Sequence, residues 1–258
     1  MAEIKIPLFE SGCVLTREML EMLKHYPMEF SELSLKDYSD GIVSGCRVSM
    51  TGNVVSVESG MIKHMGRLLF IPEGMKAVVL PGNEWHILQF VVGESRREGN
   101  FLVCNAQLEI TADLQDQGNI EVCRFRLQGG AQLRNVYQDY NDLNTEFDTV
   151  NEIYAKWSGY RKETVSVRVL EEFAKEAMKK GVQNPQDLAM IQQILALGGR
   201  SINRESLQFY LATRLNRPYA EMTNLEIYKG FGEVLRNLQT AVPKGPGRGR
   251  EERRIIVD

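Results

Sequence analysis

A change of hydrophobic period part-way along the chain constrains its fold more than any other feature of the sequence. Between residues 41 and 128, short apolar runs alternate with turns. Many of these turns contain a glycine: Gly45, Gly52, Gly60, Gly66 and Gly74. Short strands separated by turns every eight to twelve residues or so are typical of an antiparallel β domain. From about residue 164 onward the period becomes 3.6, which is typical of amphipathic helices.

The β-rich part, residues 1–128, is predicted to begin with a short helix. Thr16 is placed to cap it, and we expect Pro27 to end it because proline has no amide hydrogen to donate. The strand-like runs that follow are 48–50, 54–57, 61–65, 67–71, 76–80, 85–92, 101–108 and 120–128. The charged loop 93–100 is typical of an exposed hairpin end. Its Arg96 and Arg97 are available to water or to an acidic partner.

Residues 129–160 follow neither period, and we expect an extended connector there. The segment is polar but carries spaced aromatic residues: Tyr137, Tyr140, Phe147, Tyr154 and Trp157. Rings in such a stretch indicate that it lies against another surface, belonging to its own chain or to a neighbour. We therefore predict partner contacts at Tyr137, Tyr140, Phe147 and Trp157.

The acidic run 139–148 within the connector invites comparison with a calcium-binding loop. Counted from Asp142, the sixth position is Phe147, where an EF-hand needs glycine. The twelfth position is Ile153, where a bidentate glutamate is needed. A capped loop or a solvated face is therefore expected, and no metal site.

Residues 161–240 predict a four-helix domain with short loops. The signals that begin or end its helices are the stop at Gly181, the cap Asn184 before Pro185, a cap at Ser201 or Asn203, and the capping box Thr223–Glu226. The first two helices are expected to turn these residues inward: Val165, Val169, Leu170, Phe173, Ala174, Ala177, Met178, Leu188, Ile191, Ile194 and Leu195. The tail, residues 241–258, is basic and flexible by composition. Its candidate contacts for a phosphate backbone or an acidic partner are Arg248, Arg250, Arg253 and Arg254.

Composition excludes several classes of protein. The 258 residues are 43% hydrophobic and carry a formal net charge of −3, so the chain can build a core and gives no whole-chain argument for nucleic acid. No apolar run approaches the roughly 18 residues of a membrane helix. The first residues lack the basic and apolar segments of a signal peptide, so we expect a chain that is cytoplasmic during assembly.

No motif points to a cofactor or to catalysis. The sequence has no GK[ST] loop, no GxSxG elbow, no strand-following GxGxxG and no HExxH. We interpret His86 as a polar residue at a strand edge. The alternative is that His86 and Cys104 form a catalytic pair. No CxxC pair occurs, and we expect buried, reduced thiols at Cys13, Cys46, Cys104 and Cys123.

Two stretches carry a resemblance to known proteins. The strands at 41–48, 54–60 and 66–72 have the patterns Gly-Ile-Val-x-Gly-x-x-Val, Val-x-Val-x-x-Gly and Gly-Arg-x-Leu. Preceded by the segment 9–12 and a short helix, this order resembles the N-terminal β modules of phage tail, baseplate and tail-fibre-attachment proteins. Residues 123–151 resemble prophage-encoded proteins of Gram-positive gut bacteria, some of which bear a helicase label that the missing phosphate loop contradicts here. The resemblance implies a structural component of a phage tail or injection particle.

We therefore predict a structural or assembly component of a phage tail, baseplate or phage-derived contractile particle. Its fold class would be α+β: a β-rich assembly module at 1–128, a connector at 129–160, a helical domain at 161–240 and a tail at 241–258. Its partners would be other tail or baseplate proteins in a homo- or hetero-oligomer that becomes part of a virion or phage-like particle. No catalytic, cofactor-binding or metal residue is predicted.

Two alternatives stay open. One is a polymer-acting hydrolase that uses carboxylates such as Glu84, Glu94 or Asp113. The other is a nucleic-acid-associated factor that works through the basic tail.

Overall fold

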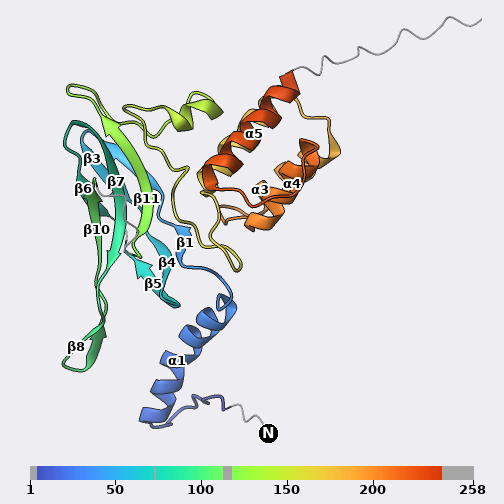
Figure 1. Cartoon of the computed structure of the whole chain (residues 1–258). Coiled ribbons are helices and arrows are strands. Elements are labelled where there is room, and N and C mark those ends of the chain that lie inside the picture. The colour runs from blue at the N-terminus through green and yellow to red at the C-terminus, as the bar shows by residue number, and fades with distance from the viewer. Residues whose placement is uncertain (1–4, 73, 113–117, 240–258) are drawn as a thin grey trace, which may run out of the picture.

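The computed structural model describes residues 5–72, 74–112 and 118–239 (Figure 1). Its strands are β1 (Gly41–Gly45), β2 (Val48–Thr51), β3 (Val54–Val57), β4 (Gly60–His64), β5 (Arg67–Ile71), β6 (Met75–Val78), β7 (Gly82–Val92), β8 (Arg96–Glu98), β9 (Phe101–Val103), β10 (Ala106–Thr111) and β11 (Ile120–Leu127). Its helices are α1 (Arg17–Ser34), the 3-10 helix η1 (Tyr140–Asn144), α2 (Val167–Lys180), α3 (Pro185–Ala196), α4 (Arg204–Arg214) and α5 (Asn224–Gln239). The predicted α+β class, with antiparallel strands before the helical bundle, is confirmed.

The strands form small antiparallel sheets around a shared core. Their orders are β1-β4-β5, β2-β3-β6 and β10-β7-β11, and β8 pairs with β9 as a separate hairpin. The long strand β7 pairs with β10 on one side and β11 on the other. Fully buried side chains such as Ile62, Phe90 and Phe125 fill the space between the sheets. This core also takes in Trp157 from the segment that follows the strands.

The prediction of a single strand at 101–108 is wrong in one respect, because Cys104 and Asn105 separate it into two strands. The amide of Gly93 donates to the carbonyl of Asn105 over 2.8 Å, which closes the base of the β8–β9 hairpin. The chain then continues as β10 along β7. The exposed hairpin end that the charged loop predicts is confirmed, since every residue of β8 is exposed.

Helix α1 runs past the residue at which we expected it to stop. Thr16 caps it as predicted, accepting from the amide of Met19 over 3.3 Å, but Pro27 lies inside the helix and the helix ends at Ser34. Proline removes one backbone bond from the helix ladder without removing the rest. The bond that is lost is the one to the carbonyl of Leu23, while the Pro27 carbonyl accepts from the Ser31 hydroxyl over 2.8 Å.

The segment 129–160 lies against its own chain. Isolated bridges pair Trp157 with Ile42 of β1 and with Thr164, and Asn151 with Arg124 of β11. Tyr140 is buried and stacks on Tyr228 of α5, with ring centroids 4.9 Å apart. The connector therefore contributes to both cores and spans the space between them in Figure 1.

The four predicted helices are present, with Gly181, Asn184, Asn203 and the Thr223–Glu226 box at their ends. Gly181 has φ 75°, the left-handed conformation that ends helices. Met178, Leu188 and Leu195, which we expected to face inward, are exposed.

The reason for the displaced α3 face is a buried ion pair. Asp187, not Leu188, points into the bundle and is fully buried. It accepts from the Tyr210 hydroxyl over 2.7 Å and from Arg214 Nε over 2.8 Å. Met190, Ile191 and Ile194 are the apolar residues that share its face.

Two turn glycines give a matched test of this backbone. Both have positive φ, 68° at Gly45 and 60° at Gly52, but a Cβ on Gly45 would lie 2.2 Å from the Ser59 carbonyl oxygen while one on Gly52 would contact nothing. We expect Gly52→Ala to lower the free energy of unfolding by about 1 kcal/mol and Gly45→Ala by about 3 kcal/mol. Urea unfolding curves measure both, and equal losses would contradict the packing at Gly45.

Candidate functional site

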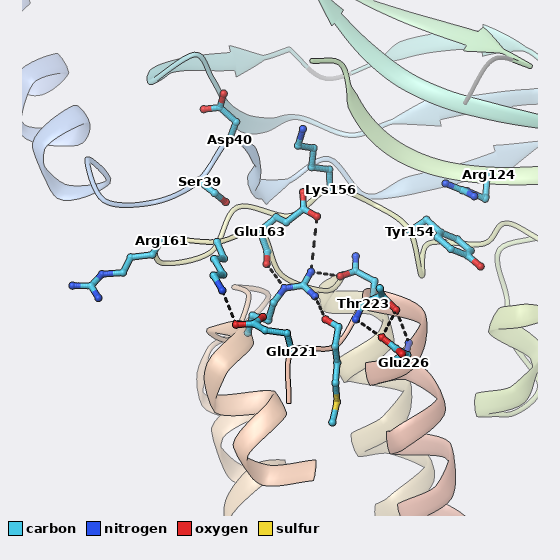
Figure 2. Close-up of a pocket in the computed structure, with 14 residues that line it drawn as sticks. Ser39, Asp40, Arg124, Tyr154, Lys156, Arg161, Glu163, Glu221, Thr223 and Glu226 are labelled. Atoms are coloured by element: carbon cyan, nitrogen blue, oxygen red, sulfur yellow. Dashed lines mark hydrogen bonds and ion pairs between the residues drawn. The ribbon is translucent and has the colours of Figure 1, made fainter. Parts of the chain in front are cut away.

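A polar cleft of about 710 Å³ lies between the ends of the strands and the helical bundle (Figure 2). Its walls carry the cations Arg124, Lys156, Arg161, Lys162 and Arg204 and the carboxylates Asp40, Glu163, Glu221 and Glu226. Such a mixture of charges in one cleft is a candidate binding site, so the partner of each group decides what the cleft can do.

Arg204, the first residue of α4, is the hub of this cleft. It is only 7% exposed, and its guanidinium donates to the carbonyls of Glu163 and Met222 over 2.6 Å each and to the Asn224 side chain. These partners belong to the loops that enter α2 and α5. Burial lowers the pKa of the Arg204 guanidinium, but an arginine stays charged at any ordinary pH.

Two of the remaining charges of the cleft, Lys162 and Glu221, pair with each other, and Arg124 pairs with Glu121 outside the cleft. Lys162 Nζ lies 2.6 Å from Glu221 Oε1, and the hydrogen bond from Lys162 lowers the pKa of Glu221. The amide of Thr223 donates to Glu226 over 2.7 Å, which lowers the pKa of that carboxyl and closes the capping box of α5. These bonds use the groups to fix loops, so the cleft acts as a structural joint.

The joint predicts two different responses to mutation. Arg204→Ala leaves buried acceptors without a donor and is expected to lower the free energy of unfolding by about 3 kcal/mol. Lys162→Ala breaks an exposed pair in the same cleft and is expected to change the free energy of unfolding far less than Arg204→Ala does. Thermal and urea unfolding of both variants measure this, and a small effect at Arg204 would contradict its role as the hub.

The other candidate site is the N-terminal arm, residues 5–34. Large apolar side chains that are half exposed or more crowd this arm: Ile6, Leu8, Phe9, Val14, Leu15, Leu20, Leu23, Tyr26, Met28, Phe30 and Leu33. Met28 lies on the opposite side of α1 from Tyr26 and Phe30, and we call the other ten residues the arm surface. No residue of α1 is buried, and Figure 1 shows the helix projecting away from both the strands and the bundle.

The arm surface contains a groove of about 720 Å³. Residues 5–7 lie along α1, where Lys5 Nζ is 3.2 Å from Glu18, and the groove between them is lined by Met22, Leu23 and Tyr26. We predicted no partner contact on this helix, because ending it at Pro27 left Phe30 and Leu33 outside the apolar repeat. The spacing of Met19, Leu23, Tyr26, Phe30 and Leu33, alternately four and three, was the signal that could have found them.

The root of α1 is fixed by a buried lysine. Lys63 of β4 is 4% exposed, and its ammonium donates to the carbonyls of Leu35, Lys36 and Tyr38 over 2.7, 3.1 and 2.6 Å. A cation at this position also suits the negative end of the helix dipole. The arm is therefore presented from a rigid base.

The structure divides the partner contacts predicted from sequence. Arg96 and Arg97 are exposed on the β8–β9 hairpin, where Arg96 pairs with Glu98 and the apolar Phe101 and Leu102 are also exposed. Arg96 and Arg97 remain candidate contacts. Arg248, Arg250, Arg253 and Arg254 lie outside the described residues.

Three of the four predicted aromatic contacts need correction. Tyr137, Tyr140 and Trp157 are buried in the chain's own cores, because the surface against which the connector lies belongs to this chain. Phe147 is half-buried beside the Arg126 guanidinium, which is 5.5 Å from its ring centroid.

The alternatives for catalysis find little geometric support. Glu84 and Glu94 are exposed near opposite ends of β7, roughly 30 Å apart at strand spacing. A glycosidase pair needs a separation of about 5–9 Å. His86 stacks on Phe125, whereas Cys104 contacts the Gly93 carbonyl about 20 Å farther along the strand. Asp113 lies outside the described residues.

The cysteines are free, but only two are buried. Cys46 and Cys123 are in the core, and burial raises the pKa of the Cys46 thiol to about 12. Cys104 is partly exposed and Cys13 is exposed, so the expectation that they are buried is wrong. Cys13 lies on the arm, which packs against no core.

The acidic run 139–148 forms a capped loop, as predicted. Asp139 caps η1, accepting from the amides of Asn141 and Asp142. Asp142 accepts from both terminal nitrogens of Arg134, one of them over 2.6 Å. Within the described residues, no group of three or more His, Cys, Asp or Glu side chains could hold a metal ion.

The Asp142–Arg134 pair makes stability depend on acid. Hydrogen bonds from Arg134 hold the pKa of Asp142 well below its usual range, so its contribution is complete above about pH 4 and is lost as the pH falls below that. We expect Asp142→Asn to cost about 1.5 kcal/mol at pH 7, a modest value because Arg134 is partly exposed. The difference from the wild type should shrink toward pH 2. Urea unfolding across this range measures it, and a constant difference would contradict the assignment.

Comparisons with known proteins give weak likenesses. No family model matches the chain, and no curated protein does. A crystal structure of TssK aligns over 90% of this chain and 71% of its own, with a TM-score of 0.42 and 7% identity. A chain of the type VI secretion system TssK-TssF-TssG baseplate subcomplex, solved by cryo-electron microscopy, aligns over 93% of this chain and 100% of its own, with a TM-score of 0.40 and 9% identity.

A third structure, the baseplate complex from the type VI secretion system, has a TM-score of 0.39 and 8% identity over 92% of this chain and 100% of its own. Scores of this size are too low to say what this chain does. Among the helices of the described residues, none combines the length and the hydropathy of a membrane-spanning segment.

Proposed function

We propose that this chain is a structural subunit of a baseplate or tail-like particle and that it binds neighbouring subunits through its N-terminal arm. One observation carries the proposal: an 18-residue helix with apolar side chains has no buried residue. A helix of this kind is stable in water only when its apolar face is covered.

The size of the arm surface supports an interface. Its ten side chains expose on the order of 1,000 Å² of apolar area, compared with about 300–600 Å² for the largest patch of a typical monomer. The area exceeds the roughly 800 Å² that each partner contributes to a standard protein–protein interface. The β8–β9 hairpin, with Arg96, Phe101 and Leu102 exposed, is a second and smaller contact surface in this proposal.

In this proposal residues 1–128 are the assembly module, residues 129–160 the connector and residues 161–240 the helical domain. The partners are other baseplate or tail proteins, and the particle is a phage tail or a related contractile device. The chain would be made in the cytoplasm and would act without catalysis. The resemblance of its 41–72 segment to phage baseplate modules supports this choice over a hydrolase, whose candidate carboxylates Glu84 and Glu94 lie far apart.

The proposal predicts that the arm holds the chain in a larger particle. In the cells that produce it, the full chain should sediment with a high-mass complex, and a variant lacking residues 1–34 should sediment at its own mass. The deletion leaves both cores intact because α1 contributes no buried residue. Gradient sedimentation with immunodetection measures this, and unfolding curves of the purified variant control for stability. A full chain found only as itself would overturn the proposal.

A further inference from the structure

The apolar side chains of α1 follow a heptad repeat. Met19, Leu23, Tyr26, Phe30 and Leu33 are separated by four, three, four and three residues. At 3.6 residues per turn they lie within about 40° of one line along the helix. We call this line the seam. Tyr26 at its centre is 74% exposed, and Phe30 is 65% exposed.

The rest of the helix is mostly polar. None of the charged residues of α1 lies on the seam: Arg17, Glu18, Glu21, Lys24, Glu29 and Glu32. Met28 is the apolar residue about 180° from the seam, and it is 53% exposed. A period of 3.5 fits a helix that winds around another helix, because it keeps the same stripe facing the partner over successive turns. The shape of the seam therefore specifies an α-helical occupant.

The scarcity of charged residues beside the seam favours a second copy of the same helix as its partner. In a coiled coil the flanking positions select the partner by opposite charge. Here those positions hold Leu20, Met22, Pro27, Glu29 and Ser34, so Glu29 is the one charged flank. In a parallel pair Glu29 would face Ser34 of the other copy, and no like charges meet. A seam without charge selection suits self-pairing, and the arm surface, which contains four of the five seam residues, exposes enough apolar area for a dimer interface.

We infer that α1 forms a coiled coil with α1 of a second copy of this chain, through the seam Met19, Leu23, Tyr26, Phe30 and Leu33. This inference rests on the proposed assembly function and names one of its partners. The clamp of Lys63 on the carbonyls that follow α1 would hold each copy's helix at a fixed angle to its strands.

Light scattering of the purified full chain tests the inference with a matched pair of variants. The wild type should be a concentration-dependent oligomer, and Phe30→Glu should weaken self-association at least tenfold. Met28→Glu adds the same charge to the opposite face of the helix and should leave the association unchanged. Circular dichroism and unfolding curves verify that both variants keep the wild-type fold.

Cross-linking then tests the geometry itself. Tyr26 is at the middle of the seam, so it meets its counterpart whether the helices run parallel or antiparallel. With the exposed Cys13 replaced by serine, Tyr26→Cys should form a disulfide-linked dimer under mild oxidation, and Met28→Cys should not. A monomeric wild type without a Tyr26→Cys cross-link would overturn the inference. Equal cross-linking at both positions would also overturn it.

The outcomes separate this inference from the proposed function. A purified monomer that still enters the high-mass particle through residues 1–34 would contradict self-pairing and would still support the assembly role. A monomer that becomes an oligomer only when residues 240–258 are deleted would mean that the chain's own tail covers the seam, which also overturns self-pairing. An oligomer that never enters a larger particle would sink the assembly role alone.

Discussion

The fold depends on the backbone of residues 129–160, which hydrogen-bonds to the strands on one side while its side chains enter the helical bundle on the other. Asn151 exchanges two bonds with Arg124 of β11, and the Lys156 carbonyl accepts from the amide of Ile42 in β1. On the bundle side, the Tyr140 hydroxyl donates to the carbonyl of Tyr228 in α5 over 3.1 Å. Neither core is complete without this segment, so the two halves are joined by packing as well as by chain connection.

That arrangement leaves the arm as the part of the described molecule that finds no core. The strands and the bundle bury their apolar residues against each other and against the connector. The arm, by contrast, meets the rest of the chain mainly at its root, where Lys63 binds the carbonyls that follow α1. An apolar helix on a fixed base is an unfavourable arrangement in water for an isolated chain, and burial of the helix in an assembly would offset that cost.

Local signals in the sequence were enough for the bundle and for most strands, because caps and turns act over a few residues. Gly181, Asn184 and the Thr223–Glu226 box each lie at the helix ends that their chemistry predicts. The errors arose where residues distant in the sequence decide which side chains are buried. Asp187 is buried because Tyr210 and Arg214 satisfy it, and no local pattern reveals those partners.

The predictions for the connector and for the arm were wrong for opposite reasons. The rings of Tyr137, Tyr140 and Trp157 were correctly predicted to lie against a surface, but sequence could not say whose surface it was. The seam of α1 was visible in the spacing of five residues, and the rule that proline ends helices hid it. Pro27 costs one backbone bond, and the turns on either side of it keep theirs.

Pairing through α1 would change what the rest of the surface can do. Each copy carries the β8–β9 hairpin, with Arg97 and Phe101 exposed on it, and a single small hairpin offers too little area for tight binding. Two or more hairpins held by one coiled coil would bind a repeated partner with a high effective concentration after the first contact. This gain in effective concentration depends on a fixed angle between each α1 and its strands, because it is lost when the hairpins cannot bind the partner at the same time. The Lys63 clamp would thus link the geometry of the seam to binding at the β8–β9 hairpin, whose base lies beside the β4–β5 turn, where Arg67 donates to Ser95 over 3.0 Å.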